Sequence, residues 1–126
     1  MLCKQSVACR ELYIMILAVD FDKVLGNLAE YPALDPPKDI HRFVAWYVKR
    51  KQKQGWYVIL NTCRENGALI SALNYLDVFY EFKPDNENAN APWLIEKYGD
   101  CRKISCDINI DDKNMGLIGW LLRRLG

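Results

Sequence analysis

The stretch Ile14-Met15-Ile16-Leu17-Ala18-Val19-Asp20-Phe21-Asp22 decides the fold. Six apolar residues lead directly into two aspartates that stand one residue apart, and an aliphatic run bounded by charge is typical of a strand buried on both faces. Such strands lie inside parallel sheets, which bind ligands at the carboxyl ends of their strands. Asp20 and Asp22 are therefore expected at that edge, where a divalent cation would relieve the repulsion between them. On the pair alone, a helix N-cap at Asp20 and a solvated turn at Asp22 explain the two residues equally well.

The remaining pattern alternates between helices and strands. Apolar residues at helical spacing predict helices over 39–54, 67–75, 92–98 and 115–125, the first of them introduced by Asp35-Pro36-Pro37. Runs rich in β-branched and aromatic residues predict strands over 56–60, 77–82 and 103–110. Residues 84–90 are predicted to form a polar loop. This order predicts an α/β fold with a mainly parallel central sheet between layers of helices.

Length and charge limit the possible classes of protein. The 126 residues fit one domain over 1–126, and residues 1–11 have no clear period and could form a loose N-terminal arm. Seventeen Lys and Arg against 16 Asp and Glu give a net charge of +1, so no long-range field favours nucleic acid as a partner. The basic cluster Lys49-Arg50-Lys51-Gln52-Lys53 is interpreted as the solvated face and end of a helix.

Apolar runs and cysteines indicate the compartment. No apolar stretch approaches the roughly 18 residues that span a bilayer, and the segment 1–12 lacks the apolar core of a signal peptide. The five cysteines include no CxxC pair, which argues against a zinc site and a disulfide scaffold. A reducing cytoplasm is expected, with Cys63 and Cys106 as small buried residues and His41 at the surface or at a helix end.

Polar residues follow three of the predicted strands. Asp20 and Asp22 end the first strand, Thr62 ends the second, and Asp111-Asp112 ends the last, with Lys103 at the start of that last strand. In a parallel sheet these strand ends meet at one edge. Several carboxylates, a hydroxyl and an ammonium group at one edge predict a Mg²⁺ site beside a phosphate pocket.

These residues resemble the motifs of the haloacid dehalogenase-like (HAD) superfamily of phosphohydrolases. Its first motif, a hydrophobic strand followed by DxDx[TV][LV], corresponds to Asp20-Phe21-Asp22-Lys23-Val24-Leu25. The Thr or Ser of the second motif corresponds to Thr62, the lysine of the third to Lys103, and the acid pair of the fourth to Asp111-Asp112. The resemblance covers residues 13–116, and it implies a three-layer Rossmann-like sandwich.

The resemblance implies a Mg²⁺-dependent phosphatase. Asp20 corresponds to the nucleophile that forms an aspartyl-phosphate, and Asp22 to the general acid and base. Mg²⁺ would be held by Asp20, the backbone carbonyl of Asp22, Asp111 and Asp112.

Other residues of these motifs are expected to face the phosphate. Thr62, with the neighbouring Cys63 and Arg64, would hold the phosphoryl oxygens or the substrate, although an exposed salt bridge is as good an explanation for Arg64. Lys103 would offset negative charge, and Lys23 stands where most members have glycine, beside Val24 where most have threonine. Lys23 would either bind phosphate or block the site. A non-catalytic phosphate- or metal-binding module is therefore the alternative, and a receiver-like domain is the less favoured third reading.

Segment lengths bear on the substrate. The first gap holds a short flap and one helix, and the second, residues 65–102, has no room for a cap domain. The site is therefore expected to be open, with residues 27–34 and 84–92 at its mouth. A phosphorylated small molecule is the expected partner, a macromolecular phosphate is the second choice, and a homo-oligomer stays possible.

Overall fold

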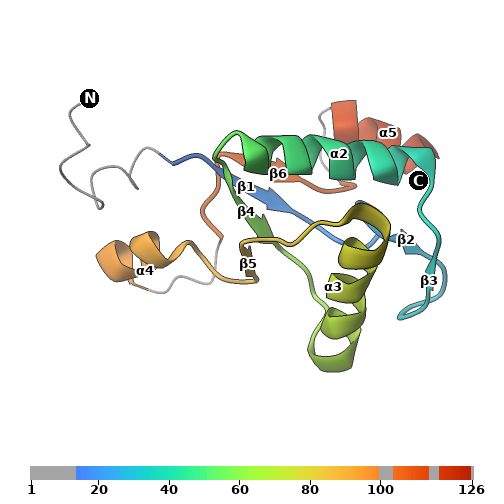
Figure 1. Cartoon of the computed structure of the whole chain (residues 1–126), viewed down its shortest axis with the longest axis horizontal. Coiled ribbons are helices and arrows are strands. Elements are labelled where there is room, and N and C mark those ends of the chain that lie inside the picture. Colours follow the sequence, from blue (N-terminus) through green and yellow to red (C-terminus); the bar gives the residue numbers. More distant parts are fainter. Residues whose placement is uncertain (1–13, 100–103, 114–116, 126) are drawn as a thin grey trace.

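A four-stranded parallel sheet lies at the centre of the protein (Figure 1). The computed structural model describes residues 14–99, 104–113 and 117–125. The sheet has the order β5-β4-β1-β6, formed by β1 (Ile16–Val19), β4 (Tyr57–Leu60), β5 (Asn86–Glu87) and β6 (Ile108–Ile110). All four residues of β1 are buried, because this strand lies between two neighbours and under helices on both faces.

The strand order places a switch point beside β1. The chain runs outward from β1 to β4 and then to β5, and it returns to add β6 on the other side of β1. In open parallel sheets, ligands bind in the crevice at the carboxyl ends of the strands where the order reverses. Here that crevice lies between the ends of β1 and β6. The order also differs from the 2-1-3-4-5 arrangement of receiver-like folds, since the third strand, β5, lies outside β4.

Helices cover both faces of the sheet. One face packs against α2 (Asp39–Lys53), α3 (Asn66–Tyr80) and α5 (Leu117–Leu125), and the other against the short helix α4 (Pro92–Tyr98). Figure 1 shows α2 and α5 along one side of the sheet. The larger core lies on this side and includes Leu17, Val19, Val44, Leu76 and Leu122. The prediction of an α/β, Rossmann-like three-layer fold with a parallel sheet is confirmed.

A small antiparallel hairpin forms the flap. Its strands are β2 (Asn27–Leu28) and β3 (Leu34–Asp35). The hydroxyl of Tyr75, on α3, donates to the carbonyl of Asp35 at 2.8 Å and accepts from the N–H of Asn27 at 3.3 Å. Because one side chain holds both strands, the base of the hairpin is fixed to α3. Among the described residues the first gap contains only this hairpin and α2, so no cap domain is inserted there.

Several predicted boundaries are wrong. Residues 77–80 continue α3, and the strand predicted over 77–82 does not form. The third strand of the sheet is instead Asn86–Glu87, within the segment predicted to be a loop. The last strand is confined to Ile108–Ile110 among the described residues. The helix predicted over 39–54 does begin at Asp39, but Asp35, expected near its cap, belongs to β3, and the residue before the helix is Lys38.

Three side chains also lie in environments other than those predicted for them. His41 is 1 % exposed, although it does lie in the first turn of α2. Its Nδ1 accepts a hydrogen bond from the backbone N–H of Lys38, the residue before the helix, at 3.1 Å. This bond turns the ring back against the protein. Cys63 and Cys106, predicted to be buried, are exposed.

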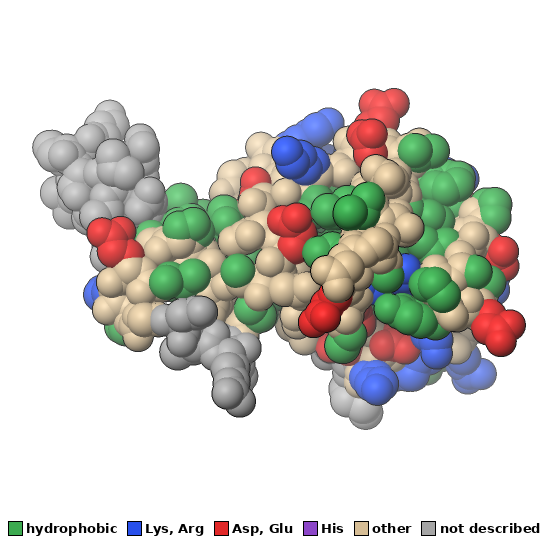
Figure 2. Space-filling model, turned by 90° about the horizontal axis from the view of Figure 1, so that it is seen from below, with side chains coloured by type: hydrophobic (Ala, Val, Ile, Leu, Met, Phe, Trp, Pro, Cys, Tyr) green, Lys and Arg blue, Asp and Glu red, His purple; other side chains and the backbone are tan. Residues whose placement is uncertain are grey.

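The surface carries charges of both signs, as the near-neutral net charge implies. Figure 2 shows acidic and basic side chains together on one face, with hydrophobic side chains between them. Within the described ranges, no helix has the length and apolar character needed to cross a membrane. The possible N-terminal arm, residues 1–11, lies outside the described residues.

Candidate functional site

The sheet brings the acidic ends of β1 and β6 together. The register pairs Val19 with Ile110, and the backbone N–H of Asp20 donates to the carbonyl of Ile110 at 2.9 Å. Asp20 and Asp111 therefore leave adjacent strands at the same level, although they are far apart in the sequence. Had the two strands run in opposite directions, these residues would lie at opposite edges of the sheet.

Asp20 lies in an unusual electrostatic environment. Burial raises its pKa to about 6 from the ordinary 3.8, and the charges of Asp112, Asp22 and Asp111 add to the effect. A hydrogen bond from the backbone N–H of Phe21 to Oδ1, at 2.7 Å, acts in the opposite direction. The charged form of Asp20 is therefore disfavoured by its surroundings, and a cation at this edge would stabilise it.

A tight loop after β1 sets the direction of Asp22. The carbonyl of Phe21 accepts three hydrogen bonds, from the N–H groups of Val24, Leu25 and Gly26 at 2.8–3.1 Å. The Phe21 ring is fully buried and lies against Gly26, where a Cβ atom would stand 2.6 Å from the ring. Glycine is required here because the loop folds back over its own aromatic side chain.

The loop directs Asp22 toward Arg64, which follows β4. The Nε atom of Arg64 lies 3.0 and 2.9 Å from the two carboxylate oxygens of Asp22, and Nη2 lies 2.7 Å from Oδ1. This is a salt bridge of several charge-assisted hydrogen bonds, which fix a carboxylate in orientation as well as in position. Both oxygens of Asp22 are engaged by one side chain.

Arg64 is enclosed by protein on every side. It is 0 % exposed, and its guanidinium lies between the rings of Phe21 and Tyr31, at 5.2 and 5.0 Å from their centroids. The carbonyls of Pro32 and Ala68 accept further, longer contacts at 3.3 and 3.4 Å. The expectations of a substrate contact or of an exposed salt bridge are therefore corrected. Arg64 positions Asp22, and it joins the loop after β1, the hairpin and α3.

Thr62 lies at the end of β4, on the same edge as Asp20. The N–H of Asn61 donates to the carbonyl of Val19 at 2.9 Å, which keeps β4 and β1 in register to their ends. Thr62 is 9 % exposed, and its hydroxyl accepts a hydrogen bond from the N–H of Arg64 at 3.1 Å. That bond uses an oxygen lone pair, so the hydroxyl proton stays available to a phosphoryl oxygen.

Asn88 belongs to the segment 84–92 that is expected at the mouth of the site, but the sequence does not single it out as a site residue. Its Oδ1 accepts the N–H of Thr62 at 2.7 Å, and its own N–H donates to the carbonyl of Leu60 at 2.9 Å. Asn88 has φ of 52°, in the left-handed region that asparagine tolerates better than most residues. The polar residues of 84–90 indicate a turn in this segment. They do not indicate that Asn88 bonds to Thr62.

Asp111 and Asp112 are partly buried in the turn after β6. One oxygen of Asp111 accepts from the Asn109 side chain at 3.1 Å and the other from the N–H of Lys113 at 2.9 Å. The carbonyl of Asp112 accepts from Arg123 on α5 at 2.8 Å. Among the described residues, no three or more His, Cys, Asp or Glu side chains are already gathered around one point. The reason is local, since Asp22 faces Arg64 and Asp111 is held within its own turn.

The other residues predicted for the site lie in different environments from one another. Lys23 is exposed and has φ of 67°, a conformation that glycine adopts without strain. Val24 next to it is fully buried in the core. Cys63 is exposed beside Thr62. Lys103 lies outside the described residues.

Comparison with known proteins adds a structural relative. The fold is similar to that of a conserved protein from Bacteroides thetaiotaomicron, with 26% sequence identity and a TM-score of 0.65. The similarity covers 87% of this chain and 88% of that one. No protein-family model and no curated protein matches the sequence.

Proposed function

We propose that this protein is a Mg²⁺-dependent phosphohydrolase of the haloacid dehalogenase-like type, acting through an aspartyl-phosphate. The proposal depends on one observation. Asp20 ends the central strand with a pKa raised to about 6, chiefly by burial, and the charges of Asp112, Asp22 and Asp111 add to that shift. Four carboxylates are costly to hold together at one sheet edge without a function that uses them.

Each residue at this edge has a role in the proposed reaction. Asp20 attacks phosphorus, and Asp22 gives a proton to the leaving oxygen and later takes one from the attacking water. Arg64 keeps Asp22 at a fixed place, since three short contacts join the two side chains. The Thr62 hydroxyl donates to a phosphoryl oxygen, and Asn88 keeps the Thr62 backbone in position. Lys103 would offset negative charge.

The donor set at this edge suits Mg²⁺, which prefers carboxylate and carbonyl oxygens. Asp20, Asp111, Asp112 and the backbone carbonyl of Asp22 would hold it, because the Asp22 side chain is already bound by Arg64. When bound, the ion supplies positive charge that stabilises the transferring phosphoryl group. The ion would stabilise the carboxylate of Asp20 most, since the surroundings of Asp20 disfavour its charged form.

The small hairpin, and the absence of an inserted cap from the part of the chain that the structure describes, favour an accessible site. The segment 27–35 covers Arg64 through Tyr31 and Pro32, and the described residues form no larger lid over the strand ends. A phosphorylated metabolite is the substrate class we favour, and a phosphate on a macromolecule is the second. The exposed thiol of Cys63 suits a reducing cytoplasm.

A screen of phosphorylated metabolites, with Mg²⁺ and with a chelator, tests the proposal. We expect phosphate release that requires Mg²⁺ and disappears in Asp20→Asn. The matched control is Asp77→Asn, an exposed aspartate on α3, which should keep full activity. Tight Mg²⁺ binding without turnover of any substrate would favour the non-catalytic module instead.

A further inference from the structure

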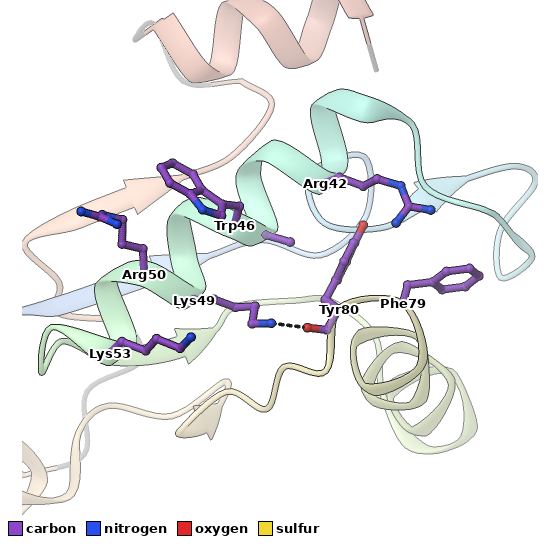
Figure 3. A pocket seen from close by; sticks show the side chains of 8 residues that line it. Arg42, Trp46, Lys49, Arg50, Lys53, Phe79 and Tyr80 are labelled. Carbon is purple, nitrogen blue, oxygen red and sulfur yellow. Dashed lines mark hydrogen bonds between the residues drawn. The ribbon is translucent and has the colours of Figure 1, made fainter.

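A hollow outside the proposed catalytic edge lies between α2 and the C-terminal end of α3. Its volume is about 320 Å³. Figure 3 shows the side chains that line it: Arg42, Ala45, Trp46, Lys49, Arg50 and Lys53 from α2, and Phe79 and Tyr80 from α3. We call it the α2 groove.

The α2 groove has one sign of charge. Four of its eight lining residues are cationic and none is acidic. They share one face of α2, because positions 42, 46, 49, 50 and 53 recur at the spacing of helical turns. Residues 40–64 contain no Asp or Glu. Within the described ranges, none of the four cations forms a salt bridge.

Three of these cations are available to a ligand. Lys49 donates from Nζ to the carbonyl of Tyr80 at 2.6 Å, which satisfies the end of α3 (Figure 3). The other three are Arg42, Arg50 and Lys53. Position 53 lies eleven residues after position 42, or about 16 Å along the helix at 1.5 Å per residue. A single phosphate could not contact all three. A ligand with a row of negative charges could.

Two exposed aromatic rings lie among the cations. Trp46 is 55% exposed and Phe79 is 36% exposed, and the guanidinium of Arg50 lies 5.7 Å from the centre of the Trp46 ring. Proteins that bind single-stranded nucleic acid combine a cationic groove with aromatic side chains on which bases stack. Trp46 stacks with Phe43 and Phe79 packs on Tyr75, so each ring is only partly exposed. An acidic peptide would satisfy the cations, but it would leave the exposed part of each ring in water.

We propose that the α2 groove binds single-stranded nucleic acid, with the phosphates along Arg42, Arg50 and Lys53 and a base on Trp46. The net charge of +1 does not oppose this, because the attraction is local to one helix face. The groove also adjoins the loop after β1, which carries Asp22. The hydroxyl of Tyr80, which lines the groove, donates to the carbonyl of Leu25 at 2.5 Å.

Fluorescence anisotropy with a short labelled oligothymidylate that lacks terminal phosphates tests this directly. The full chain is used with a chelator, so that binding does not depend on the proposed phosphohydrolase activity. We expect saturable binding that weakens with salt. The double variant R50Q/K53Q should reduce the slope of log K against log salt by about 1.4, since each lost phosphate contact contributes about 0.7. The charge-matched control K51Q/K97Q, whose residues do not line the groove, should leave slope and affinity unchanged.

The aromatic half of the proposal has its own test. Trp46→Ala should weaken oligothymidylate binding about tenfold, whereas Trp46→Phe should retain most of it, because a stacked base contributes about that much. Binding of polyglutamate should not respond to either substitution. The proposal is overturned if the oligonucleotide does not bind, if R50Q/K53Q and its control lose affinity equally, or if Trp46→Ala has no effect. In those cases the cations only stabilise the end of α2 or attract polyanions in general.

Discussion

Replacing Arg64 with methionine removes the guanidinium that holds Asp22 and leaves a side chain of similar length in its place. In the native protein, three contacts of 2.7–3.0 Å join the two side chains. Their exposures differ, because Arg64 is 0% exposed and the side chain of Asp22 is 23% exposed. The two partners should therefore respond differently when either one is lost.

The expected magnitudes follow from that difference. Removing one partner of a buried salt bridge costs about 3–5 kcal/mol. Arg64→Met leaves Asp22 able to reach water, so we expect the free energy of unfolding to fall by about 3 kcal/mol, the lower end of this range. Asp22→Ala leaves a fully buried cation with only the longer Pro32 and Ala68 carbonyl contacts, so we expect a loss near about 5 kcal/mol. The free energy of unfolding of the double variant should fall by about 5 kcal/mol rather than by the sum of the two single losses, about 8 kcal/mol. The difference is a coupling energy of about 3 kcal/mol between the two side chains.

Urea denaturation followed by circular dichroism measures these free energies of unfolding, provided that the slope m stays constant across the four proteins. Arg64→Lys, which keeps the charge but loses the planar fork, should lie between the native protein and Arg64→Met. The exposed Arg42→Met is the matched control and should change stability by less than about 0.5 kcal/mol. Additive losses in the double variant, or a larger loss in Arg64→Met than in Asp22→Ala, would refute this account of the pair.

Three further predictions concern the loop after β1. Gly26→Ala should destabilise the protein by about 1–3 kcal/mol in urea, because a Cβ atom there would lie 2.6 Å from the buried Phe21 ring; an unchanged midpoint would mean that the ring moves freely. Lys23→Gly should leave the protein equally stable or raise its stability by up to about 1 kcal/mol in the same assay, because φ is 67° at this position; a marked loss would show that the Lys23 side chain makes a stabilising contact. Asp20→Asn should raise the thermal midpoint near neutral pH, because the folded state raises the pKa of Asp20 to about 6 and so disfavours its charged form. The native protein gains stability as the pH falls from about 6 toward 3.8, so the difference between the two should shrink there, and a difference that is constant with pH would contradict the assignment.

The sequence predicts the elements whose residues pack on the core, because burial imposes a period on them. The run before Asp20 becomes β1, and the helical spacing of Ile40, Val44 and Val48 becomes the buried face of α2. The strand predicted over 77–82 does not form, because tertiary packing overrides the β-propensity of its residues. Tyr80 continues the buried stripe of α3.

Elements held by hydrogen bonds rather than by burial are not predictable in this way. The strand Asn86–Glu87 has two polar residues and is placed by its neighbours. The N–H of Asp85 donates to the carbonyl of Val58 at 2.9 Å, and its carboxylate accepts the N–H of Val58 at 2.8 Å. Nothing in the pattern of apolar residues indicates these bonds.

The candidate site shows the same division. Strand ends in a parallel sheet must converge, so the grouping of Asp20 with Asp111 follows from the fold class. The position of Arg64 does not, because an arginine is ordinarily exposed and its burial requires Asp22, Phe21 and Tyr31 together. Contacts that come from two segments distant from Arg64 in the chain leave no local trace in the sequence.

The most direct test of the proposed chemistry is a search for phosphate bound covalently to Asp20. The protein is mixed with Mg²⁺ and an aryl phosphate, quenched in acid and digested, and the peptides are analysed by mass spectrometry. The account predicts one added phosphoryl group on the peptide that contains Asp20 and none in Asp20→Asn, with Mg²⁺ required for its formation. Phosphate release that continues in Asp20→Asn, or a phosphoryl group on any other residue, would contradict it.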